Sequence, residues 1–158
     1  MSHKIRTVLW FKDRGHEAAK FYCSLIPNSQ ISSVFVSDNG GPDGNMHFEV
    51  IDFTLNGVPY QLLEAGPMFP LSECVSVMIE TPDQAETDRL WDALVEGGGS
   101  HGPCGWLKDR YGLSWQVVPE AASRLMASPD KAKAERALAA VMQMGKIDLA
   151  AVEAAAAA

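Results

Sequence analysis

Apolar and polar positions along this chain predict the same order of elements twice. The predicted strands of the first half are 5–11, 30–37, 46–55 and 58–64. A helix lies between the first two, because Ala18, Phe21, Tyr22 and Leu25 recur at helical spacing. The second half repeats this order with strands at 75–80, 104–108 and 113–118 and a helix around 84–95. The pattern therefore predicts two strand-helix-strands modules.

The residues themselves repeat as well. Asn56–Leu63 matches Tyr111–Val118 as turn, glycine, aliphatic, small residue, aromatic, glutamine and two aliphatics. At a different offset, Thr7-Val8-Leu9 matches Ser76-Val77-Met78. Internal symmetry of this kind places functional residues at the interface between the halves, so it predicts where a site lies without naming a substrate.

We therefore expect an α+β fold of two tandem βαβββ modules that form cupped mixed sheets, followed by a helical tail. Residues 1–120 form one domain with modules at about 1–65 and 74–120, joined by the Pro-rich run 66–70. Residues 121–158 form helices that pack on this domain or on a dimer partner. A module of this kind leaves one apolar sheet face exposed, so a homodimer is expected. The polar run 38–45 is expected to be a long loop.

Composition limits the classes of partner. The chain has 158 residues, 47% of them hydrophobic, and a net charge of −7, which argues against a nucleic-acid surface. Neither a signal peptide nor a membrane span is apparent, so we expect a cytoplasmic protein with no membrane partner. The three cysteines show no CxxC spacing, which fits reduced thiols in the cytosol.

Four runs resemble one known group of proteins. They are Leu9–Phe11, Glu17–Tyr22, Cys104–Asp109 and Gly112–Pro119. With the doubled βαβββ order, they resemble the vicinal oxygen chelate superfamily of glyoxalases, extradiol dioxygenases and bleomycin-resistance proteins, and within it the PhnB-like branch. That branch often carries the label 3-demethylubiquinone-9 3-methyltransferase. The chain has no GxGxxG turn of the kind that opens a nucleotide-binding helix, so its residues do not support the methyltransferase label.

The resemblance implies where a site lies. Metal-dependent members take four ligands from the first and last strands of each module, which here correspond to Thr7, Gln61, Ser76 and Gln116. Two hydroxyls and two amides are poor ligands for a divalent metal, so we expect no metal or other cofactor. These side chains either hydrogen-bond to one another or orient a neutral or anionic small molecule. Trp10, Trp106 and Trp115 are apolar walls of that pocket or core residues.

Three further residues are weaker catalytic candidates. His47 shares a strand face with Glu49, and Glu64 ends the next strand, so an acid and a base could meet there, although solvated strand faces show the same pattern. Cys104 precedes Lys108 by four residues and is either a nucleophile or a small buried hydrophobe. Lys108 and Asp109 form an ion pair or shape a turn.

The expected function is the binding of a small polar metabolite in a cupped-sheet pocket within one chain or across two. One rival is a metal-dependent lyase, isomerase or dioxygenase that recruits Glu64 or His47. The other is a non-catalytic sequestering or interaction protein.

Overall fold

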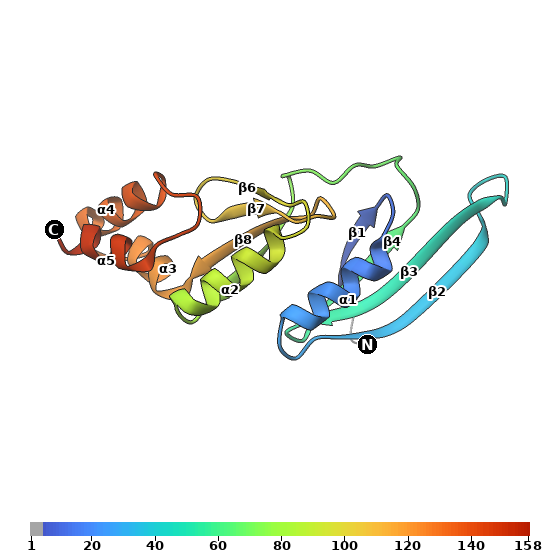
Figure 1. Ribbon diagram of the computed structural model, residues 1–158, viewed down its shortest axis with the longest axis horizontal. Coiled ribbons are helices and arrows are strands. Elements are labelled where there is room, and N and C mark those ends of the chain that lie inside the picture. Colours follow the sequence, from blue (N-terminus) through green and yellow to red (C-terminus); the bar gives the residue numbers. More distant parts are fainter. Residues whose placement is uncertain (1–4) are drawn as a thin grey trace. The chain divides into compact units, whose positions relative to one another are not determined.

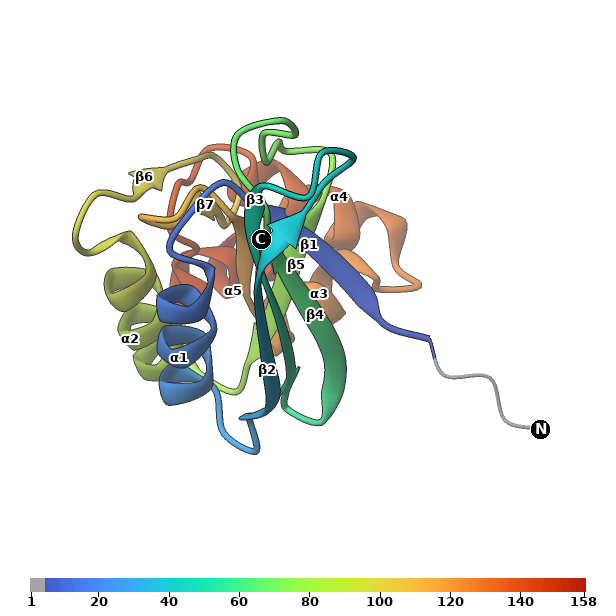
Figure 2. The ribbon, with the colours of Figure 1, turned by 90° about the vertical axis from the view of Figure 1, so that its right-hand side faces the viewer.

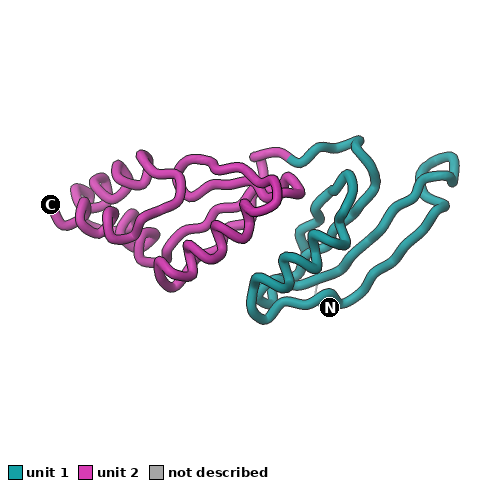
Figure 3. The backbone as a smooth tube through the Cα atoms, in the orientation of Figure 1, with its two compact units in different colours: residues 1–71 teal, residues 72–158 magenta. Residues whose placement is uncertain are grey.

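The computed structural model describes residues 5–158 and divides into two compact units, residues 1–71 and 72–158 (Figure 3). Each unit is built on its own four-stranded mixed sheet. The prediction of an α+β fold with two βαβββ modules and a helical tail is confirmed. The assignment of residues 1–120 to one domain stays a prediction, as does packing of the tail on a dimer partner.

Unit 1 follows the order strand, helix and three strands (Figure 1). Its elements are β1 (Thr7–Phe11), α1 (Gly15–Leu25), β2 (Gln30–Gly40), β3 (Met46–Leu55) and β4 (Val58–Glu64). The sheet order is β1-β4-β3-β2, with β1 parallel to β4 and the other pairs antiparallel. Asn56 and Gly57 both have positive φ, 46° and 79°, as the tight turn predicted between β3 and β4 requires.

Helix α1 lies along one face of this sheet (Figures 1 and 2). Strand residues alternate between the two faces, and Leu9, Phe11 and Leu62 are buried on the helix side. The helix residues Ala18 and Tyr22 are also fully buried. The opposite face of the sheet carries no helix of unit 1, and it is called the open face of sheet 1 below.

Unit 2 repeats the arrangement with β5 (Ser76–Thr81), α2 (Gln84–Val95), β6 (Ser100–His101), β7 (Trp106–Lys108) and β8 (Ser114–Pro119). Its sheet order, β5-β8-β7-β6, again pairs the first and last strands in parallel. Trp91 and Leu94 of α2 pack in a buried core with Trp115 and Leu107, and the face away from α2 is the open face of sheet 2.

The tail forms α3 (Glu120–Met126), α4 (Lys131–Val141) and α5 (Leu149–Ala157), which belong to unit 2. One buried cluster joins the end of β8 to these helices through Val118, Ala122, Ala137, Val141 and Val152. The segment before α5 is held by side-chain hydrogen bonds from Gln84, which donates to the Ile147 carbonyl and accepts from the Leu149 N–H. The tail is therefore anchored on the body of unit 2.

Several strands differ from the sequence prediction. β2 continues through Asp38 and Asn39 to Gly40, so the predicted loop 38–45 is shorter, because a β-bulge between Ser37 and Gly40 keeps the strand paired with β3. β6 was missed because it has only two residues next to a glycine run. No helix within residues 5–158 has both the length and the apolar character that crossing a membrane requires.

Candidate functional site

The open face of sheet 1 carries a row of four side chains, one from each strand. The register pairs Val8 with Gln61, Gln61 with Asp52, and Asp52 with Ser33. The next row on the same face consists of Trp10, Leu63, Val50 and Phe35. Val8 is 53% exposed and Phe35 is 57% exposed. This face therefore has a polar centre beside exposed apolar side chains.

Asp52 is the centre of the polar network. It accepts hydrogen bonds from the Gln61 amide at 2.8 Å, the Ser33 hydroxyl at 3.0 Å and the Arg6 guanidinium at 2.5 Å. The hydrogen bond from Gln61, followed by those from Ser33 and Arg6, lowers the pKa of Asp52. The carboxylate is therefore held ionised and is already engaged by three donors.

Thr7 does not join this network. It pairs with Tyr60, so it points to the helix side of the sheet, whereas Gln61 points to the open face. The repeat that matched Thr7 with Ser76 is one residue out of register, and a one-residue slip moves every side chain to the other face. Gln61 lies opposite Val8 and Gln116 lies opposite Met78, so Arg6 is the counterpart of Ser76. Asp13 and Asp83, which precede the two helices, are 70 residues apart in the sequence, the same separation as Arg6 and Ser76.

The open face of sheet 2 also carries a row from all four strands. Ser100 pairs with Lys108, Lys108 with Ser114, and Ser114 with Ser76. In the next row, Trp106 pairs with Gln116. Gln116 donates a hydrogen bond from its amide to the Ser76 hydroxyl at 2.8 Å. Two of the predicted residues of this unit are therefore in direct contact, with Trp106 beside them.

The three tryptophans have different environments. Trp106 is half-buried on the open face of sheet 2, and Trp10 is half-buried on that of sheet 1, where its indole N–H donates to the Gly66 carbonyl. Trp115 is fully buried on the α2 side and donates to the Asp109 carboxylate at 2.8 Å. Trp115 is thus a core residue and not a pocket wall, because β8 alternates and Gln116 takes the open face.

A hollow of about 360 Å³ lies beside Trp106 in unit 2. Its lining includes Ser100, Pro103, Trp106, Lys108, Ser114 and Glu73. A volume of this size is within the range of small-molecule sites. The sequence had indicated Trp106, but it did not indicate Ser100, Ser114 or Glu73, which only the strand register and the connecting segment bring to this place.

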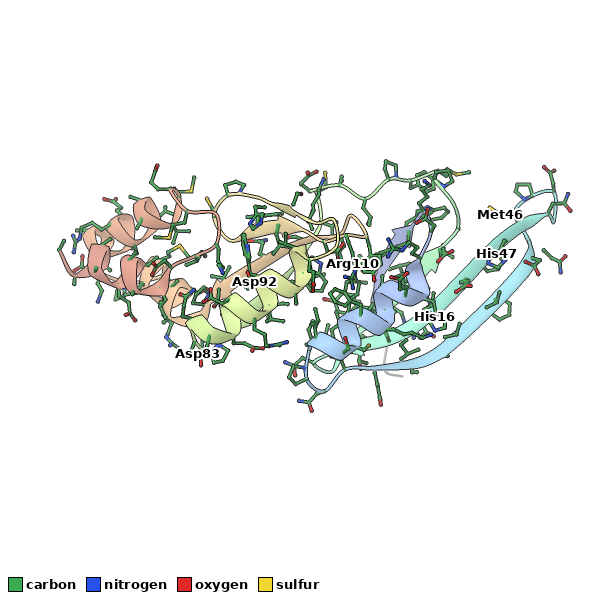
Figure 4. All side chains as sticks on the ribbon, viewed as in Figure 1. His16, Met46, His47, Asp83, Asp92 and Arg110 are labelled. Carbon is green, nitrogen blue, oxygen red and sulfur yellow. The ribbon has the colours of Figure 1, made fainter. Side chains whose placement is uncertain are left out.

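His47, which lies on β3 (Figure 4), shares the helix side of sheet 1 with Glu49, and Glu64 pairs with Glu49 on that same side. His47 Nε2 lies 3.7 Å from Glu49, and His47 Nδ1 lies 2.6 Å from Asp38. Asp38 and then Glu49 raise the pKa of His47. Glu64 accepts the Gly15 N–H at 2.5 Å and so satisfies a free donor of the first turn of α1. Glu64 and His47 therefore lie on the opposite face of sheet 1 from Gln61.

Cys104 is half-buried in a left-handed backbone conformation, and its sulfur lies 3.4 Å from the Met142 sulfur. The cation invoked to activate it, Lys108, forms an ion pair with Glu73 instead. Asp109 shapes the turn before β8, because its carboxylate accepts the N–H groups of Tyr111 and Leu113.

The side chains on the open faces do not fit a divalent metal. In the polar rows described above, Arg6 places a cation next to Asp52, Lys108 places another next to Ser114, and the other polar side chains are amides and hydroxyls. Within residues 5–158, no group of three or more His, Cys, Asp or Glu side chains is arranged to hold a metal ion. Nor is either strand-to-helix connection a glycine-rich turn that would receive a nucleotide-like cofactor, since Lys12-Asp13-Arg14 and Pro82-Asp83 form them.

Comparisons with known proteins agree with the doubled fold. The model of the 3-demethylubiquinone-9 3-methyltransferase family matches residues 3–118. A PhnB protein from Bacillus cereus is 28% identical, with a TM-score of 0.61, over 74% of this chain and 99% of that chain. No functionally curated protein matches.

Two more distant solved structures share the fold alone. The fosfomycin resistance protein FosX from Mesorhizobium loti is 11% identical, with a TM-score of 0.53, over 81% of this chain and 99% of its own. Glyoxalase I from Leishmania major is 12% identical, with a TM-score of 0.52, over 80% of this chain and 93% of its own.

Proposed function

This chain belongs to the 3-demethylubiquinone-9 3-methyltransferase family of the vicinal oxygen chelate superfamily, and we propose that it binds a small polar metabolite on its open sheet faces without a resident metal. The observation that carries the proposal is the hollow beside Trp106, which combines an aromatic wall with hydrogen-bonding side chains. Small-molecule sites have this mixture of apolar lining and a few directed polar groups.

The two glutamines support binding by hydrogen bonds. Gln61 and Gln116 take equivalent positions in the two sheets, and each amide donates to a neighbouring oxygen on the same face. An amide has two donors and one acceptor oxygen, so each of these side chains keeps groups that a ligand can use. A neutral or anionic polar molecule suits such a surface better than a metal ion does.

The rival functions receive less support. A metal-dependent lyase, isomerase or dioxygenase that recruits Glu64 or His47 would need these groups on the open face, and both lie on the helix side of sheet 1. Methyl transfer from a nucleotide-like donor lacks a turn to hold that donor. A binding and sequestering role without turnover is consistent with all the groups described on the open faces.

The test is a metabolite screen by ligand-observed NMR on the untagged protein, with each hit titrated by calorimetry. We expect Trp106→Ala and Gln116→Leu to weaken a hit by about tenfold, which is the size of one lost hydrogen bond or its packing equivalent. Gln143→Leu, at an exposed position of the tail, is the matched control. A screen with no hits, or hits indifferent to both site variants, would contradict the proposal.

The same NMR samples separate binding from turnover. We expect each hit to remain chemically unchanged over hours of incubation with the protein. A compound could instead be consumed in the presence of the protein, with the loss abolished by Trp106→Ala but not by Gln143→Leu. That result would show that the protein is an enzyme and would direct assays to the residues around the hollow.

We also propose a homodimer. Val8 and Phe35 leave large apolar surfaces exposed on the open face of sheet 1, and exposed apolar patches of this kind mark interaction surfaces. Light scattering coupled to size exclusion is the measurement. A dimeric mass that shifts toward the monomer in Phe35→Glu supports the proposal, and a monomeric mass at every concentration contradicts it.

A further inference from the structure

The hollow beside Trp106 contains a buried hydroxyl that has no partner. Ser114 is 1% exposed, and its Oγ has no hydrogen-bond partner among residues 5–158. Ser114 nevertheless lines the hollow, between Lys108 on β7 and Ser76 on β5 in the strand register. A buried hydroxyl without a partner is costly, so a polar atom entering the hollow would gain a hydrogen bond that the chain itself does not supply.

The neighbouring cation is engaged by a carboxylate from outside the sheet. Lys108 Nζ lies 2.5 Å from a carboxylate oxygen of Glu73, and both residues line the hollow. The hydrogen bond from Lys108 lowers the pKa of Glu73. Glu73 lies on the segment between β4 and β5, and its side chain is 66% exposed, whereas that of Lys108 is 36% exposed. The Glu73 side chain can therefore move into solvent while Lys108 stays on its strand.

The apolar part of the hollow is flat. The lining includes Pro103 and the half-buried indole of Trp106, which stands on the same sheet face as Lys108, one row away. An aromatic or planar apolar group packs well on an indole. The hollow thus combines one cation, one unpartnered hydroxyl and one flat apolar wall.

We propose, building on the proposed function, that the ligand of this hollow is a small carboxylate with a flat apolar body. The ligand carboxylate replaces that of Glu73 at Lys108 Nζ and accepts the hydroxyl of Ser114, while the body packs on Trp106. Glu73 is then a built-in competitor that occupies the carboxylate position when the ligand is absent. Binding involves exchange of one ion pair for another, with no covalent step.

Calorimetric titration with phenylacetate and its amide, phenylacetamide, tests the proposal. These probes share the aromatic body and differ in the charge that Lys108 would recognise. We expect saturable binding of phenylacetate and binding of phenylacetamide that is at least about tenfold weaker, because a charge-assisted hydrogen bond is lost. Phenyl phosphate binding more tightly than phenylacetate would overturn the assignment of a carboxylate.

Three variants of the hollow and one control variant locate the binding. Lys108→Met should weaken phenylacetate by about tenfold or more, and Lys12→Met, at an exposed lysine of unit 1, should leave it unchanged. Ser114→Ala should weaken binding several-fold without lowering the melting temperature, because the hydroxyl has no partner within the described chain. Glu73→Gln should strengthen binding, since the competing charge is removed. Unchanged affinity in Lys108→Met and Ser114→Ala would overturn the inference.

The outcomes distinguish this inference from the proposed function. If metabolite hits bind and depend on Trp106 but phenylacetate and phenylacetamide bind equally, the carboxylate inference fails and the proposed function stands. If phenylacetate does not bind while other hits do, the carboxylate inference again fails and the proposed function stands. If neither the probes nor any metabolite binds, both fail.

Discussion

Gln116 donates its side-chain amide to the hydroxyl of Ser76 at 2.8 Å, and this hydrogen bond joins the last strand of unit 2 to the first. The two residues are diagonal neighbours on the open face, since Gln116 pairs with Met78 and Ser76 pairs with Ser114. The contact fixes the orientation of the amide next to Trp106. In unit 1 the equivalent amide, that of Gln61, is held by Asp52 instead.

A double-mutant cycle on Gln116→Leu and Ser76→Ala should give a coupling free energy of about 0.5–1.5 kcal/mol for this hydrogen bond. Urea unfolding of the wild type, the two single variants and the double variant provides the four values. Strict additivity of the two single variants would mean that the contact does not contribute in solution, and Gln143→Leu serves as a control at an exposed position of the tail.

Chelation should leave the protein unaffected. Because Arg6 sits beside Asp52 and the Gln116–Ser76 pair is uncharged, dialysis against a chelator should change neither the melting temperature nor the affinity for a metabolite hit. Elemental analysis before chelation and after reloading with divalent metals completes the measurement. One tightly bound ion per chain, with a melting temperature that falls on its removal, would contradict this expectation.

Asp109→Ala should destabilise unit 2 by about 1–3 kcal/mol, the usual cost of leaving buried donors unsatisfied. The carboxylate is 3% exposed and accepts the Leu113 N–H and the Trp115 indole N–H. Asp109→Asn should cost less, because its amide oxygen can still accept. Urea unfolding gives both values, and Asp43→Ala, in the turn between β2 and β3, should change stability little.

His47 should make stability depend on pH. Its pKa is raised by Asp38 and Glu49, so the protonated imidazole is favoured in the folded state. The stabilising contribution is then fully present below the ordinary histidine pKa of about 6.5 and is lost as the pH rises through the higher folded-state value. His16, whose Nδ1 lies 4.0 Å from Glu49, and Glu64, which pairs with Glu49 in the strand register, are titratable groups that also face this cluster.

The measurement is the difference in urea midpoint between wild type and His47→Gln at several pH values. The urea midpoint of the wild type should exceed that of the variant at acidic pH. The difference should shrink in alkali, because the imidazole loses its proton, and in high salt, because the pair is exposed. Asp38→Asn should reduce the same difference. A gap between wild type and variant that grows with pH would show that the sign is wrong.

Much of the fold could be predicted because the hydrophobic periods are regular. The alternation in 46–55 and 58–64 and the Asn56-Gly57 turn specify a hairpin locally. The helical spacing of Ala18 and Tyr22 likewise identifies the buried side of α1. β6 escaped prediction because two residues are too few for a period to be visible.

The candidate site was harder to predict because it depends on which face each residue takes. Ser76 and Gln116 were predicted at one site, and the structure joins them by a hydrogen bond. Thr7 was placed with Gln61 through a repeat one residue out of register, and Arg6 was overlooked. Trp115 has the same aromatic character as Trp106 in the sequence, but the alternation of β8 buries it against α2.

By itself, the sequence determined the doubled βαβββ order, the helical tail and the poverty of metal ligands in the repeated strands, because these depend on local periodicity and on residue type. Only the tertiary structure decided that Lys108 pairs with Glu73, that the hydroxyl of Ser114 is buried without a partner in the described chain, and that Glu64 and His47 lie away from Gln61. The physical reason is that strand pairing brings together residues far apart in the chain, and a shift of one residue in that pairing exchanges the two faces of a sheet.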